Sequence, residues 1–157
     1  MGFKPAKSPK KKLDSIDLQI IRALEENSRA SLRKLANRVG ITPNILHNRI
    51  NSLEHERVIL GYTPIIDATK MGYPLTAIIM LQVEGNHIIE VEKKIAQESN
   101  VQSVYDITGE YDAVVFAKFR DNSSLNSFLK KLLAERFIKR TITKVAFEAA
   151  KEYIKII

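Results

Sequence analysis

Three asparagines are spaced so that they fall on one face of a short helix. Asn44, Asn48 and Asn51 recur at intervals of four and three residues, which places them on one side of a helix at 100° per residue. Asparagine favours helices only weakly, so three on one exposed face need a reason. A side-chain amide can pair with an adenine edge in the major groove through two hydrogen bonds. The spacing points to DNA reading, with a merely solvated polar face as the alternative.

A pair of short helices joined by a tight turn is predicted to carry these amides, within residues 31–60. Ser31 is the expected N-cap of the first helix, and Gly40 supplies the left-handed residue that ends it. Thr42 and Pro43 then restart the chain as N-cap and first helical residue. This order of signals predicts a helix-turn-helix.

The second helix of this pair has a predicted inside as well as an outside. Leu46, Ile50 and Leu53 form a narrow apolar stripe, and the asparagines lie roughly 140 to 200° from Leu46. Hydroxyl, imidazole and guanidinium groups flank the amides and are expected to reach phosphates. The predicted DNA-contacting residues are Ser31, Thr42, Asn44, His47, Asn48, Arg49 and Asn51.

The positive charge of the chain is concentrated in its first part. The 157 residues are 45% hydrophobic, enough for one or two small globular domains, and carry a net charge of +7. Residues 1–60 hold 12 Lys and Arg against 6 Asp and Glu, whereas residues 61–157 hold 13 against 12. A basic module joined to a nearly neutral one is expected when a DNA-binding domain is attached to something else. Generic solubility charge is the alternative.

Several classes of function are disfavoured by what the sequence lacks. It has no cysteine, which removes disulfides, thiolate zinc sites and cysteine nucleophiles and fits a reducing compartment. No apolar run approaches the roughly 18 residues of a membrane span, so we expect a cytoplasmic protein without a membrane partner. His47, His55 and His87 have no nucleophile or carboxylate constellation nearby, so no catalytic or metal site and no enzyme activity is expected.

Four segments are expected along the chain. Residues 1–12 form a basic, disordered tail that either touches phosphates or only aids solubility. Residues 13–57 form the helix-turn-helix domain, whose first helix starts at a capping box of Asp14 and Asp17. Residues 58–70 form a hinge strand or linker, and residues 71–157 form a second domain.

The second domain shows the same pattern twice. Residues 76–109 and 112–147 each read as strand, polar turn, helix and strand. The order βαββαβ predicts a ferredoxin-like fold, with a four-stranded antiparallel sheet and two helices on one face. The strands over 75–84 and 111–119 are apolar on both alternating sets, so the other sheet face needs a cover. A second copy of the sheet is the simplest cover, which predicts a homodimer.

Four segments together resemble the Lrp/AsnC family of transcription regulators. They are LDSIDLQIIRALEENSR at 13–29, RINSLE at 49–54, VILGYTPIID at 58–67 and TGEYD at 108–112. The resemblance implies an α+β protein with an N-terminal winged-type helix-turn-helix and a C-terminal ferredoxin-like (RAM) domain for amino-acid sensing. It also implies dimers that assemble into octamers. One departure is Arg57, where the family usually has glycine, so we expect a reshaped helix end there.

The same resemblance places a small-molecule effector at the TGEYD turn, usually between dimers. Carboxylates around the turn favour a cationic amino acid such as lysine or arginine, through an α-ammonium or basic side chain. A plain hairpin turn and an inactive pocket remain alternatives. The expected effector-binding residues are Asp106, Gly109, Glu110, Tyr111, Asp112, Thr141 and Thr143.

The sequence thus predicts a sequence-specific, double-stranded DNA-binding transcription regulator whose effector is a small amino acid, with no other cofactor. The alternative is a chromatin-like architectural DNA binder that ignores metabolites. The two differ in one respect, because only the regulator should change its binding or assembly when an amino acid is added.

Overall fold

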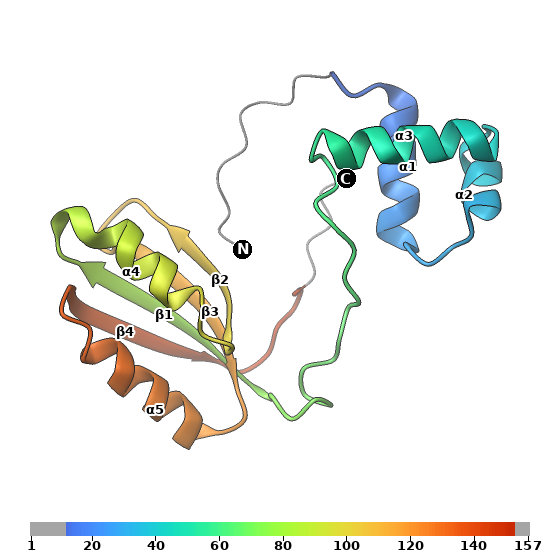
Figure 1. Cartoon of the computed structure of the whole chain (residues 1–157). Helices are drawn as coiled ribbons and strands as arrows, with labels where there is room; N and C mark the ends of the chain where they lie inside the picture. Colours follow the sequence, from blue (N-terminus) through green and yellow to red (C-terminus); the bar gives the residue numbers. More distant parts are fainter. Residues whose placement is uncertain (1–11, 153–157) are drawn as a thin grey trace. The chain divides into compact units, whose positions relative to one another are not determined.

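The computed structural model describes residues 12–152 in two compact units that divide between Ile65 and Ile66 (Figure 1). This division falls within the 58–70 segment predicted as hinge or linker. The predicted basic tail lies outside the described residues except for Lys12, and so do residues 153–157.

The N-terminal unit contains three helices, α1 (Ser15–Glu26), α2 (Leu32–Val39) and α3 (Pro43–His55). Their apolar stripes form one core, because no helix of the three can bury its stripe alone. The fully or nearly buried members are Ile20, Ala23, Leu24, Leu35, Ala36, Leu46, Ile50 and Leu53. The helix-turn-helix is confirmed, and residues 12–65 contain no strand that serves as a wing.

The predicted caps position the two helices of the motif. The Ser31 hydroxyl accepts the Lys34 backbone N–H at 3.3 Å, and the Thr42 hydroxyl accepts the Ile45 N–H at 3.4 Å. Gly40 has φ 76°, in the left-handed region that favours glycine, and its N–H closes the last turn of α2. The turn between α2 and α3 is therefore fixed by local chemistry.

The end of α3 differs from the expectation drawn from Arg57. Arg57 adopts φ 57°, the left-handed conformation that glycine would take more readily. The N–H groups of Val58 and Ile59 both donate to the Leu53 carbonyl, at 2.8 and 3.1 Å. These bonds keep the usual helix end in spite of the side chain, so the prediction of a reshaped end is wrong.

Residues 58–74 form no strand, so the predicted hinge strand is not formed and the segment is a linker. Gly61 and Pro64 interrupt it, and no strand among residues 12–152 pairs with it. The Tyr62 hydroxyl donates to Glu54 of α3 at 2.8 Å. Partial desolvation of the hydroxyl, with this bond, raises the pKa of Tyr62 to about 12, although the side chain as a whole is exposed. The exposed apolar side chains of the segment are Leu60, Tyr62, Ile65, Ile66 and Met71.

The C-terminal unit has the predicted βαββαβ order. Its elements are β1 (Leu75–Val83), η1 (Gly85–His87), α4 (Ile88–Ile95), β2 (Val101–Asp106), β3 (Ala113–Phe119), α5 (Asn122–Leu133) and β4 (Ile138–Ala146). The strands pair antiparallel in the order β2-β3-β1-β4, which is the ferredoxin-like arrangement.

The two faces of the sheet differ in their cover. Helices α4 and α5 pack on one face (Figure 1), where alternate residues such as Ile79, Leu81 and Val115 are fully buried. The intervening residues point to the opposite side, here called the open face. Its apolar members are Ile78, Met80, Val114, Phe116 and Ile142, which are only partly buried.

Candidate nucleic-acid interface and ligand turn

Helix α3 presents the amide side chains on the side opposite its buried stripe. Asn44, Asn48 and Asn51, here called the amide face, are all exposed, whereas Leu46 and Leu53 are 0% and 1% exposed. The helix packs by its apolar stripe, so the amides are left available to a partner. The three amides therefore lie on the solvent-exposed side of α3.

Three flanking residues of the predicted set lie beside the amide face or at the helix starts. His47 Nε2 is 3.2 Å from the Asn51 side-chain amide, one turn along α3. Ser31 and Thr42 use their oxygens as N-cap acceptors, and each retains its O–H as a donor. A phosphate oxygen is an acceptor that such a hydroxyl can bind.

Arg49 is oriented differently from the prediction that it reaches phosphates. Its Nη1 donates to Asp14 at 2.7 Å and to Asp17 at 2.8 Å, so its guanidinium joins α3 to the start of α1. These hydrogen bonds raise the pKa of Arg49. The Asp17 backbone N–H, followed by Arg49, lowers the pKa of Asp14. Sequence reasoning placed Arg49 by its charge and did not foresee this partner.

The TGEYD turn connects β2 to β3 and is held by Asp112. The Asp112 N–H donates to the Leu81 carbonyl at 2.9 Å, and its carboxylate accepts the Val83 N–H at 2.7 Å. Its carbonyl accepts the Ile107 N–H at 2.9 Å. Gly109 has φ 122°, which favours glycine. One oxygen of the Asp112 carboxylate is thus already used to fix the end of β1.

Arg140 of β4 covers the turn. Its guanidinium lies 6.0 Å from the centre of the Tyr111 ring and 3.4 Å from a carboxylate oxygen of Glu110. Tyr111 is buried, at 8% exposure, while Glu110 is exposed. Sequence reasoning did not predict that a basic residue would lie beside the acidic residues of the turn, because Arg140 is distant from them along the chain.

The remaining predicted effector residues lie on the helix-covered side of the sheet. Thr141 pairs with Leu81 and Thr143 with Ile79, whose side chains are buried beneath the helices. Asp106 is exposed and pairs with Ala113. Burial, followed by the charge of Asp106, raises the pKa of Glu92 on α4. Glu92 is a further acidic neighbour that sequence reasoning missed, because only the packing of α4 against the sheet brings it there.

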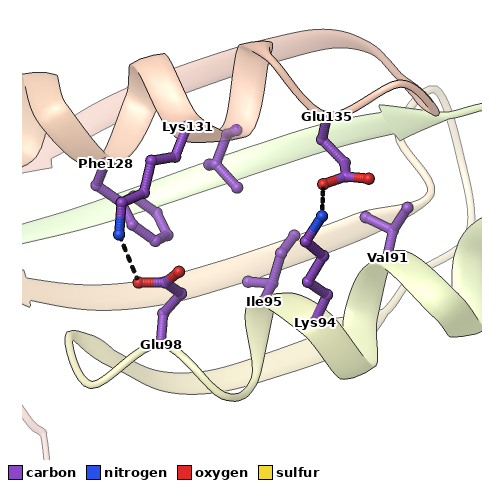
Figure 2. Close-up of a pocket in the computed structure, with 8 residues that line it drawn as sticks. Val91, Lys94, Ile95, Glu98, Phe128, Lys131 and Glu135 are labelled. Atoms are coloured by element: carbon purple, nitrogen blue, oxygen red, sulfur yellow. Dashed lines mark hydrogen bonds and ion pairs between the residues drawn. The ribbon is translucent and has the colours of Figure 1, made fainter.

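The groove between α4 and α5 is small, and two ion pairs span it (Figure 2). Lys94 pairs with Glu135, and Lys131 pairs with Glu98 at 3.4 Å, each across the groove. Its volume is about 50 Å³, well below the roughly 300 Å³ at which small-molecule pockets begin. Its apolar floor consists of Val91, Ile95, Phe128 and Leu132.

A second, wider groove of about 340 Å³ lies beside the start of β2 and the end of β3. It is lined by linker residues such as Met71 and Tyr73 and by Asn100 and Lys118. Neither groove includes a residue of the TGEYD turn. In the part of the chain that the structure describes, no cluster of three or more His, Asp or Glu could hold a metal ion, and no helix is long and apolar enough to cross a membrane.

Both parts of the chain match known family models. Residues 13–54 match the AsnC-type helix-turn-helix domain, and residues 76–156 match the Lrp/AsnC ligand binding domain. An HTH-type transcriptional regulator of Pyrococcus furiosus is 40% identical over 144 residues, which cover 92% of this chain and 97% of that protein.

Solved structures with the same fold include LrpC of Bacillus subtilis, with 26% identity and a TM-score of 0.81 over 91% of this chain and 100% of that one. A transcriptional regulator of Neisseria meningitidis, solved as an L-Met complex, matches with a TM-score of 0.85 and 22% identity, covering 90% and 94% of the two chains. With its helix-turn-helix and its ligand-binding domain, the chain belongs to the Lrp/AsnC family of transcriptional regulators.

Proposed function

We propose that the protein reads specific DNA sequences through the amide face of α3. The observation that carries the proposal is the exposure of Asn44, Asn48 and Asn51 opposite a fully packed stripe. The positive charge of residues 1–60 supports it, because attraction to phosphates supplies non-specific affinity and steers the approach. Ser31, Thr42 and His47 are the proposed flanking contacts.

The DNA-binding form is proposed to be a homodimer that pairs through the open face of the sheet. Partly buried apolar side chains on both central strands support this, since a surface of this kind in a small domain favours an apolar partner. Two copies of α3 would then enter successive major grooves roughly 34 Å apart on a palindromic site. Assembly of dimers into an octamer remains part of the proposal.

A small amino acid is the proposed effector, bound at the TGEYD turn where one dimer meets another. The match to a ligand-binding domain supports an effector, and a related regulator has been solved with L-Met. Asp106, with Glu92 beside it, favours a ligand that carries a cationic group. Because neither groove in the single chain includes the turn, the site is proposed to be completed by a second dimer.

The test combines light scattering with DNA binding in the presence of each of the twenty amino acids. One amino acid, expected to be lysine or arginine, should change the mass of the assembly and the affinity for a selected duplex together. Gly109→Val, which strains the turn, should abolish that response while leaving DNA binding without effector unchanged. DNA binding that none of the twenty alters would instead favour the effector-independent architectural binder.

A further inference from the structure

A four-part hydrogen-bond network joins the start of α1 to the middle of α3. In the capping box, Asp14 Oδ1 accepts the Asp17 N–H at 2.8 Å and Asp17 Oδ2 accepts the Asp14 N–H at 3.3 Å. The other oxygen of each carboxylate, Asp14 Oδ2 and Asp17 Oδ1, accepts from Arg49 Nη1. One guanidinium nitrogen therefore bridges both halves of the box.

Burial makes this network different from an ordinary surface ion pair. The Asp17 side chain is 0% exposed, and Asp17 is the one charged residue buried among residues 12–152. The Arg49 side chain is 26% exposed and Asp14 is 48% exposed. A buried carboxylate is costly unless charged donors compensate it, so the geometry at Arg49 is strongly constrained.

The direction of Arg49 follows from its place on α3. With Leu46 at zero, Arg49 lies about 60° away, on the side of the buried stripe, and roughly 130° from the centre of the amide face. A side chain that reaches inward to a fixed partner determines how far a helix is rotated about its own axis. The angle at which Asn44, Asn48 and Asn51 face outward is tied to the contact between Arg49 and Asp17.

We propose that Arg49 is a positioning residue, which through Asp14 and Asp17 sets the rotation of α3 and so the presentation of the amide face, without itself contacting DNA. The inference rests on the proposed sequence-specific DNA binding. It separates two effects that an arginine on a DNA-binding helix can have. A phosphate contact adds affinity for every sequence, whereas a positioning residue adds affinity only for the sequence that is read.

The experiment compares full-length wild type with Arg49→Gln and Asp17→Asn. The probes are a duplex selected by the wild-type protein from a randomised pool and a scrambled duplex of the same length, both titrated over a series of salt concentrations. Arg38→Gln is the matched control, because Arg38 of α2 forms an exposed ion pair with Glu26 of α1 and its loss removes the same charge. Far-UV circular dichroism and urea unfolding establish that each variant is folded under the binding conditions.

Both network variants should lose about tenfold in affinity for the selected duplex, which corresponds to about 1.4 kcal/mol. The affinity of Arg49→Gln for the scrambled duplex and its salt slope should stay near those of Arg38→Gln, and Asp17→Asn should bind the scrambled duplex no more weakly than wild type. The direction of the affinity change in Asp17→Asn discriminates best. Removal of a negative charge by itself strengthens attraction to DNA, so a weaker affinity for the selected duplex must come from lost positioning. The double variant should be no weaker than either single one, since both break the same contact.

Other outcomes overturn the inference. A phosphate contact would reduce the salt slope of Arg49→Gln by about one and weaken both duplexes equally, while Asp17→Asn would bind no more weakly than wild type. If Asp17→Asn does not fold, Asp14→Asn at the half-exposed position carries the same test of sign. A wild-type protein that selects no sequence contradicts the proposed function itself, a result distinct from a changed salt slope in Arg49→Gln.

Discussion

Asn48 lies in the middle of the amide face, with Asn44 one turn before it and Asn51 almost one turn after it. Replacement by alanine removes a bidentate donor and acceptor, so Asn48→Ala should lose about 1–3 kcal/mol of affinity for the selected duplex. Affinity for the scrambled duplex should not change. Stability should not fall, because alanine favours the helix more than asparagine does. Competition binding with both duplexes measures the difference.

Asn37→Ala is the matched control, since Asn37 is exposed on α2 and lies outside the predicted contact set. It should leave both affinities at wild-type values. If Asn48→Ala keeps the full preference for the selected duplex, Asn48 does not read DNA and the amide face is only a solvated surface.

Glu92 on α4 carries a carboxylate that is partly removed from water by the fold. Its Oε1 is buried and has no hydrogen-bond partner among the described residues, and burial with the charge of Asp106 raises its pKa. The folded state therefore binds the Glu92 proton more tightly than the unfolded chain, so this residue lowers stability as pH rises above its ordinary value of 4.5. Protonation at lower pH removes the penalty.

Glu92→Met, which removes the charge and the unpaired oxygen, should raise the melting temperature at pH 7 by about 2–4 °C. The gain should shrink towards pH 4, and thermal scans at several pH values measure it. Glu90→Met, at an exposed site on the same helix, serves as the control. A gain that is constant with pH would show that packing rather than charge is responsible.

At the scale of elements, the end of α3 contains Arg57 in a left-handed backbone conformation that disfavours a side chain. A side chain in the left-handed region costs roughly 1–2 kcal/mol. Glycine avoids this cost, but it loses more conformational entropy on folding, which offsets part of the gain. Arg57→Gly should therefore stabilise the N-terminal domain by about 0.5–1 kcal/mol in urea unfolding. Arg57→Ala keeps the Cβ atom and should give no such gain. An equal gain in both variants would mean that the arginine charge, not the backbone, is the source.

Elements with strong local signals were predictable from the sequence. The capping box at Asp14, Gly40 after α2 and Thr42-Pro43 before α3 each act within a few residues, and the structure confirms all three. The repeat in the second domain was predictable from alternating and helical periodicity. A finer repeat was overlooked, since Val91, Lys94, Ile95 and Glu98 have the same spacing as Phe128, Lys131, Leu132 and Glu135. That shared pattern places a lysine of each helix opposite a glutamate of the other or of its C-terminal end, which gives the two reciprocal ion pairs of Figure 2.

Interactions between elements were harder to predict because they depend on distances in space. Arg49 and Asp17 are 32 positions apart, so the sequence indicates only that Arg49 is a positive charge on a DNA-binding helix and not which carboxylate it contacts. Arg140 reaches Glu110 only because β4 lies beside β1, and the end of β1 is hydrogen-bonded to Asp112 of the TGEYD turn. Composition left residues 58–70 open between a hinge strand and a linker, because β-branched residues favour a strand only when a neighbouring strand pairs with them, and no strand among residues 12–152 does so.

At the scale of the whole molecule, the proposed homodimer depends on the open face of the sheet. Phe116 lies at its centre, between Ile78 of β1 and Ser103 of β2. Phe116→Lys places a charge in the proposed dimer interface, where its desolvation is costly. Light scattering should then give the mass of one chain, 17.8 kDa, in place of a multiple of it. Leu133→Lys, at an exposed apolar position on α5, should leave the wild-type mass unchanged.

The same variant links assembly to DNA binding. A dimer on a palindromic duplex gains from two half-sites at once, so the loss of dimerisation should reduce affinity for the full site by about 100-fold or more while leaving affinity for one half-site unchanged. The helices of the N-terminal unit should remain folded by circular dichroism, since the substitution lies in the other unit. If Phe116→Lys keeps the wild-type mass, the open face is not the interface. If the mass falls to one chain but full-site affinity is retained, the protein reads DNA as a monomer and the palindrome is not needed.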